Sequence, residues 1–145
     1  MKRLISFLLV AVLLLSLAGC SGSKIRVWDW AQSLTREDIS SVEIWSMQEN
    51  DYLYESVDDA QILELITLLN KLTKASFTEN KRLAGITPTV GLKIQTTSES
   101  YHINYAPSPY GKYGMLEMSY QEKMWWIDDA ELLAYFLAVT ENVTE

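Results

Sequence analysis

The chain contains one cysteine and one histidine among its 145 residues. A single cysteine excludes a disulfide within the chain, because domains stabilised by disulfides carry cysteines in pairs. One cysteine and one histidine are also too few for the usual zinc ligand sets, and no spaced run of Asp and Asn resembles a calcium-binding loop. We therefore expect a protein without a bound metal or another cofactor.

Basic residues are scarce. Lys and Arg number 12 against 19 Asp and Glu, which gives a formal charge of −7 at pH 7. Nucleic acids and anionic lipid surfaces attract clustered Lys and Arg, so this balance argues against both as electrostatic partners. Proline is also rare, and 48% of the residues are hydrophobic. This composition predicts a packed globular domain rather than a disordered chain, with no nucleic-acid partner.

Catalytic motifs are missing as well. The only histidine, His102, has no nucleophile motif near it, and the chain contains no Gly-rich phosphate loop. Two acidic pairs, Asp58/Asp59 and Asp128/Asp129, are the remaining candidates for acid–base chemistry. Both pairs precede an apolar helical pattern, where the helix dipole favours carboxylates. We therefore expect them to be helix starts rather than catalytic acids, and we expect no enzymatic activity.

The feature that is present is an apolar run at the N-terminus. Lys2 and Arg3 are followed by residues 4–17, which are apolar except for two serines, and Cys20 comes three residues later. A run of this length is typical of the hydrophobic segment of a signal peptide. It is shorter than the roughly 20 residues that a transmembrane helix needs.

The residues Leu17-Ala18-Gly19-Cys20 resemble the lipobox of bacterial lipoproteins. The resemblance implies cleavage between Gly19 and Cys20, a diacylglyceryl group on the Cys20 thiol, and lipid anchoring on the extracytoplasmic face of the cell membrane. Two acyl chains suffice for stable anchoring. The alternative is an ordinary secretory signal with an incidental cysteine. We expect a signal peptide at 1–19, a lipidated N-terminus and tether at 20–38, and a single α+β domain at 39–145.

Apolar and polar residues alternate in several later segments, and two segments show helical spacing. The spacing predicts one helix at 59–73, capped by Asp58, and a last helix capped by Asp128. The first two predicted strands form a hairpin, and residues 75–88 show no clear pattern. We expect the α+β class, with an antiparallel sheet of about four to six strands and two helices packed on one face as a two-layer sandwich. The expected strands are 39–48, 52–54, 89–97, 101–105, 113–120 and 123–127.

Two further patterns have two interpretations each. Lys24, Arg26, Trp28 and Trp30 occupy alternating positions. The two tryptophans either lie at the membrane interface, close to the lipid, or pack on the domain as a peripheral strand or arm. We favour packing, because an exposed tryptophan pair is costly. Residues 57–63 and 127–133 match at four of seven positions. They are either copies of a duplicated strand–strand–helix unit or two independent helix starts, and we favour the second explanation.

Aromatic residues are concentrated late in the chain, and six of them form a candidate binding surface. Tyr and Trp dominate surfaces that stack on sugars or bind proteins, but they are also ordinary strand formers on the outer face of a sheet. Strand alternation places the two tryptophans on opposite faces, so they cannot both face the core. The six residues are Tyr101, Tyr105, Tyr110, Tyr113, Trp125 and Trp126.

The leading functional hypothesis is a lipid-anchored, non-enzymatic binding or interaction module at the cell envelope, with a protein or a glycan as its partner. It is based on the lipobox, the single compact domain and the lack of a catalytic set. Two alternatives stay open. One is an envelope hydrolase that acts on glycan or peptide, and the other is an accessory subunit of an envelope complex.

Overall fold

The computed structural model describes residues 25–49, 51–81, 87–107 and 115–141. Within these ranges no helix has both the length and the apolar character needed to cross a membrane. The described chain forms α2 (Val27–Ser33), η1 (Arg36–Asp38), β1 (Ile39–Gln48), β2 (Asp51–Ser56), α3 (Asp59–Lys71), η2 (Lys74–Ser76), β3 (Phe77–Glu79), β4 (Val90–Thr96), β5 (Ser100–Tyr105), β6 (Leu116–Tyr120), β7 (Lys123–Ile127) and α4 (Ala130–Thr140).

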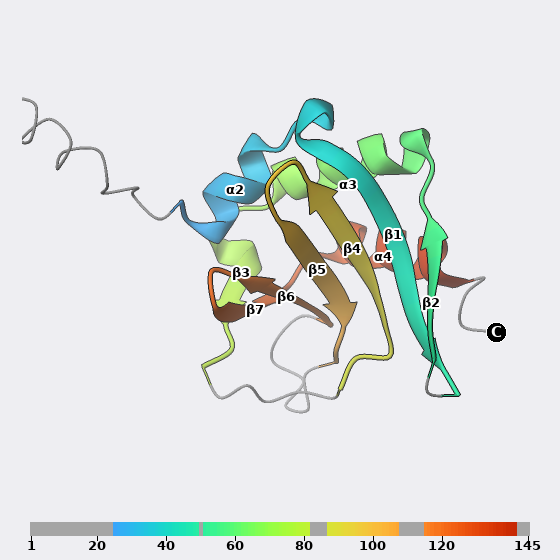
Figure 1. Cartoon of the computed structure of the whole chain (residues 1–145). Coiled ribbons are helices and arrows are strands. Elements are labelled where there is room, and N and C mark those ends of the chain that lie inside the picture. Colours follow the sequence, from blue (N-terminus) through green and yellow to red (C-terminus); the bar gives the residue numbers. More distant parts are fainter. Residues whose placement is uncertain (1–24, 50, 82–86, 108–114, 142–145) are drawn as a thin grey trace, which may run out of the picture.

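The described strands form one sheet of seven, in the order β2-β1-β4-β5-β6-β7-β3, and every neighbouring pair is antiparallel. Figure 1 shows α3 and α4 behind this sheet. The α+β class with an antiparallel sheet is confirmed, but the sheet has more strands than the expected four to six. The additional strand, β3, lies in the segment 75–88 that shows no clear sequence pattern. It pairs with the edge of β7, and this tertiary contact is not encoded by local propensity.

Local sequence explains the β1–β2 hairpin and the helix that follows it. β1 covers the predicted range 39–48 and pairs with β2 without a register shift. The carboxylate of Asp58 accepts a hydrogen bond from the backbone N–H of Gln61 at 2.8 Å, and the Gln61 side chain accepts one from the Asp58 N–H at 3.3 Å. This reciprocal capping box satisfies donors at the start of α3 and confirms the predicted cap.

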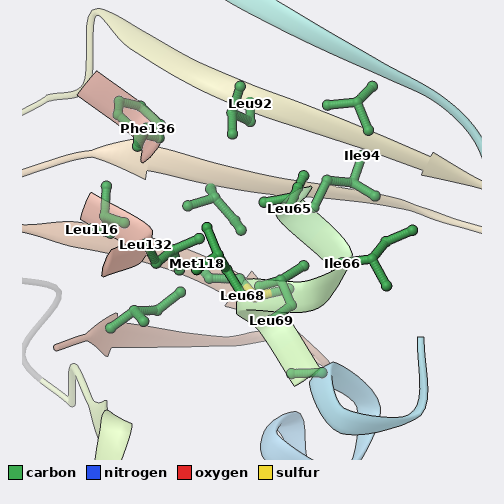
Figure 2. Packing of buried hydrophobic residues seen from close by; sticks show 14 of the residues in the cluster. Leu65, Ile66, Leu68, Leu69, Leu92, Ile94, Leu116, Met118, Leu132 and Phe136 are labelled. Atoms are coloured by element: carbon green, nitrogen blue, oxygen red, sulfur yellow. The ribbon is translucent and has the colours of Figure 1, made fainter. Parts of the chain in front are cut away.

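The hydrophobic core lies between one face of the sheet and the helices (Figure 2). We call this side the inner face. It carries Leu92, Ile103 and Met118, which are cross-strand neighbours on β4, β5 and β6 and are fully buried. Leu69 of α3 and Phe136 of α4 belong to the same buried cluster. Full burial of such a side chain contributes about 1.5–3 kcal/mol, so this layer holds the sheet and the helices together.

The N-terminal segment is a helix, so the expectation of a peripheral strand or arm was wrong in conformation. In α2, Trp30 is buried, and its ring centroid lies 4.5 Å from that of Tyr101 on the inner face. The Gln32 side chain donates a hydrogen bond to the Leu72 carbonyl at 2.7 Å, which joins α2 to α3. The buried core therefore begins at Val27, upstream of residue 39 where the sequence analysis places the start of the domain.

The other N-terminal tryptophan, Trp28, packs edge to face on Trp125 of β7, with ring centroids 6.3 Å apart. The Arg26 guanidinium lies 5.2 Å from the Trp28 ring centroid, and the Lys74 ammonium lies 5.9 Å from it. These contacts favour the packed interpretation of the two tryptophans. They also position the start of α2 beside β7, next to the sheet edge formed by β3.

The start of α4 differs from the expected one by a single residue. The N-cap is Asp129, whose carboxylate accepts a hydrogen bond from the Leu132 backbone N–H at 2.8 Å, whereas Asp128 was expected. The matching residue of the first helix start is Asp58, which aligns with Asp128 and not with Asp129. The two similar segments thus cap their helices from different positions, which favours independent helix starts over a duplicated unit.

Candidate functional site

The six aromatic candidates do not share one face of the sheet. Tyr101, Tyr105 and Trp125 lie on the inner face, where each is half-buried against the core. Trp126 points to the opposite side and is buried, at 3% exposure. The opposite orientation of the two tryptophans agrees with strand alternation. Tyr110 and Tyr113 lie outside the described residues, and so do Gly19 and Cys20.

The side of the sheet away from the core, which we call the outer face, carries a row of residues that runs across all seven described strands. Trp45 of β1 stands opposite Tyr54 of β2 and Gly91 of β4. The row continues through Asn104 and Glu117, which are cross-strand partners on β5 and β6. It then reaches Trp126 and Thr78 on β7 and β3. Aromatic groups therefore flank a polar centre.

Gly91 makes this row feasible. A Cβ atom at this position would lie 2.7 Å from Cε2 of the Trp45 indole and would also collide with the Asn104 side-chain oxygen. Both Trp45 Nε1 and Asn104 Oδ1 are buried, and neither has a hydrogen-bond partner among the described residues. A buried donor and a buried acceptor thus lie over the same glycine. Both atoms are inaccessible to solvent, so this point is a buried polar site within the outer face.

Glu117 is a buried carboxylate next to this point. Its side chain is 8% exposed and accepts a hydrogen bond from the Asn80 side-chain amide at 3.0 Å. Burial raises the pKa of Glu117, and the hydrogen bond from Asn80 partly opposes that increase. Glu117 is the only acidic residue in this row, which therefore does not contain the two facing carboxylates that a glycosidase uses.

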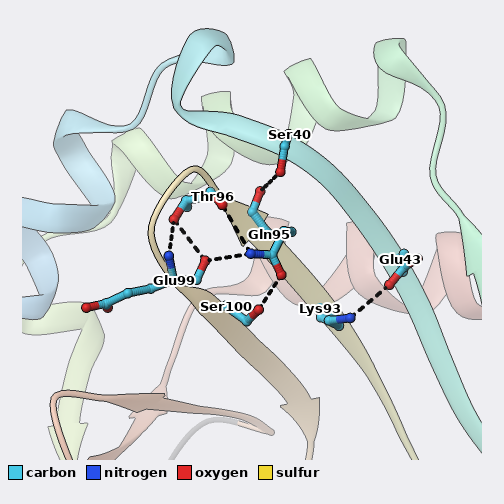
Figure 3. Close-up of polar contacts among 7 residues, drawn as sticks. All are labelled: Ser40, Glu43, Lys93, Gln95, Thr96, Glu99 and Ser100. Carbon is cyan, nitrogen blue, oxygen red and sulfur yellow. Dashed lines mark hydrogen bonds and ion pairs between the residues drawn. The ribbon is translucent and has the colours of Figure 1, made fainter.

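The neighbouring part of the outer face is polar. Lys93 of β4 forms an ion pair with Glu43 of β1 at 3.2 Å (Figure 3). At the end of β4, on the inner side, Thr96 closes the β4–β5 hairpin by donating to the Glu99 carbonyl at 2.8 Å. His102 stands opposite Lys93 on β5. Burial, followed by the charge of Lys93, lowers the pKa of His102, so its imidazole is neutral at neutral pH. No nucleophile–base pair arises from this set.

The β2 strand lies at one edge of the sheet, and all six of its residues are exposed. Tyr52 and Tyr54 point outward with 60% and 58% of their surface accessible, and Leu53 on the inner side is 46% exposed. Met47 of β1 stands beside Tyr52 and is also exposed. The alternation of tyrosines predicts this strand, but only the strand order shows that it is an edge.

The remaining chemical candidates have structural roles. Asp58 and Asp129 cap helices, and Asp59 forms an ion pair with Arg36 at 2.7 Å. Across the described ranges, no group of three or more Cys, His, Asp or Glu side chains is arranged to hold a metal ion.

Comparison with known proteins adds no relative to this picture. No protein-family model, curated protein or solved structure matches the chain.

Proposed function

We propose that this chain is a lipid-anchored, non-enzymatic binding module on the extracytoplasmic face of the cell membrane. The lipobox-like residues that end at Cys20 support the anchor. The observation that carries the binding role is the fully exposed β2 strand, which presents two tyrosines at the sheet edge. Tyrosine provides a large contact area and a polar tip at low entropic cost, so exposed pairs of this kind favour recognition of a protein or a glycan.

The described chain starts at the end of the domain that lies opposite the β2 strand. Cys20 precedes Ile25 by five residues, which span at most about 18 Å when extended. The start of α2 packs beside β7, whereas β2 is the far edge of the sheet. Six strand spacings separate β2 from β3, a distance of about 29 Å. The proposed anchor thus holds one sheet edge close to the lipid and leaves the β2 edge accessible from the envelope.

A photo-crosslinking amino acid at position 54 tests the binding role in intact cells. Tyr54 is 58% exposed on β2, and Leu63 is 51% exposed on α3, so the same probe at position 63 is a matched control. We expect one discrete adduct to an envelope protein or glycan from position 54 and none from position 63. Equal labelling at both positions, or no adduct from position 54, contradicts the proposed surface.

The non-enzymatic assignment has its own check. Because His102 is the only histidine and Glu117 is the one buried carboxylate among the described residues, they are the variants to compare. We expect the purified lipoprotein to leave envelope glycans and peptides intact. Turnover that disappears in His102→Ala or Glu117→Gln identifies a hydrolase and contradicts the proposal.

A further inference from the structure

Along β2, the backbone N–H and C=O groups of successive residues point alternately toward β1 and away from the sheet. The N–H of Val57 donates to the Val42 carbonyl at 2.9 Å, so these two residues form a hydrogen-bonded pair. Hydrogen-bonded and non-hydrogen-bonded residue pairs alternate along an antiparallel ladder. The β1–β2 register has no shift, so this alternation continues along the whole of β2. The N–H and C=O groups of Tyr52, Tyr54 and Ser56 therefore point away from β1, along the free edge.

The edge lacks several devices that prevent strand pairing. Edge strands are usually protected by charged side chains, lysine above all, by inward-pointing charges, by proline, by a bulge or by a very short length, and of these β2 carries only the acidic residues Asp51 and Glu55. β2 has six residues, contains neither lysine nor proline, and has no register shift against β1. The opposite edge differs, because β3 is only three residues long. Of the two sheet edges, β2 is the one with enough accessible backbone to receive another strand.

The charges on β2 determine which strand fits. Asp51 and Glu55 share the inner side of the strand and flank Leu53, and all three are exposed. On the outer side, the Lys93 ammonium lies 5.7 Å from the Tyr54 ring centroid, but it is already paired with Glu43. The inner side of the edge is therefore acidic. If β2 of a second copy paired with β2, acidic residues of the two strands would face one another. The two molecules also carry a formal charge of −7 each, so both effects oppose self-association.

We infer that β2 receives an extended basic segment of a partner protein as an eighth, antiparallel strand. This inference rests on the proposed binding function and specifies its partner. In the added strand, basic residues stand opposite Asp51 and Glu55, and an apolar residue stands opposite Leu53. Aromatic or β-branched residues cover Tyr52 and Tyr54. Main-chain hydrogen bonds to the outward groups supply affinity, and the alternating side chains supply specificity.

The probe is a blocked synthetic hexapeptide, Lys-Thr-Val-Tyr-Lys-Thr, added to the full chain in a nonionic detergent. In the antiparallel register its first lysine meets Glu55 and its tyrosine meets Tyr52. The backbone of that tyrosine faces β2, whereas the backbone of the valine faces away. We expect N-methylation of the tyrosine to abolish binding and N-methylation of the valine to leave it intact. Amide exchange of Tyr52, Tyr54 and Ser56 slows at least tenfold in the complex.

Two protein variants test the charge and backbone requirements separately. Glu55→Lys weakens peptide binding about three- to fivefold at moderate salt, as expected for an exposed ion pair, while Glu64→Lys on α3 has no effect. Tyr54→Pro removes one outward N–H without touching the β1 ladder, and an unchanged melting temperature shows that it folds.

Strand addition is contradicted if neither N-methylated peptide binds more weakly than the unmodified peptide. If adducts still form at position 54, the binding function survives. Tighter binding of a Glu-for-Lys peptide contradicts the basic partner.

Discussion

Among individual residues, Glu117 carries the clearest energetic conflict. It is the only acidic side chain that is buried among the described residues, and Asn80 is its hydrogen-bond donor at 3.0 Å. Because burial raises its pKa above that of the unfolded chain, protonation favours the folded state. The stabilising effect is complete below the unfolded pKa and is lost as the pH rises through the folded pKa. At neutral pH, Glu117 therefore reduces the stability of the fold.

Replacement of this carboxyl group by an amide should relieve the conflict. Glu117→Gln keeps an oxygen acceptor for Asn80 and removes the buried charge, so we expect a higher melting temperature at pH 7. For a domain of this size the increase is about 3–6 °C for each kcal/mol of relief. The advantage should vanish below about pH 4, where the native carboxyl is protonated. Melting curves of Glu117→Gln and of the exposed control Glu64→Gln across this range measure it, and a pH-independent difference contradicts the charge argument.

At the level of elements, the α4 start offers a matched pair of adjacent aspartates. Asp129 caps the helix at 2.8 Å, whereas Asp128 is exposed and contributes its backbone N–H, at 2.9 Å, to the Ser76 carbonyl. We expect Asp129→Ala to lower the free energy of unfolding by about 1 kcal/mol and Asp128→Ala to change it little. Denaturant unfolding of the two variants provides the measurement. A larger loss in Asp128→Ala indicates that the first aspartate caps in solution.

Helices and strands could be predicted from the sequence where the spacing of apolar residues extended over many consecutive positions and the caps were local. The spacing in 39–48 and the cap at Asp58 locate β1 and α3, because alternation and capping are properties of neighbouring residues. α2 and β3 are short and become stable through contacts with α3 and β7, so no local pattern marks them. Strand order is likewise non-local, which is why Tyr52 and Tyr54 were recognised as a strand but not as an exposed edge.

At the scale of the whole molecule, the proposed anchor determines which surfaces meet lipid and which meet the envelope. Cys20 precedes Ile25 by five residues, which reach at most about 18 Å, less than the roughly 29 Å across the seven strands, so the proposed anchor would restrict rotation of the domain. Arg26, Trp28 and Lys74 cluster at the end where this segment enters the domain. β2 lies at the other edge of the sheet, so an added strand would extend the sheet away from the anchor.

This orientation can be measured because Cys20 is the only cysteine in the sequence and the proposed lipidation would block its thiol. A cysteine introduced at Thr78 on β3 or at Ser56 on β2 is then the sole free thiol, and both positions are exposed. With a donor dye on each variant and acceptor dye in the bilayer, we expect stronger energy transfer from position 78 than from position 56.

A second variant tests the anchor itself. Cys20→Ala should stop uptake of labelled lipid and leave the precursor uncleaved. Equal transfer from both positions contradicts the orientation, and undiminished lipid labelling of Cys20→Ala contradicts the anchor.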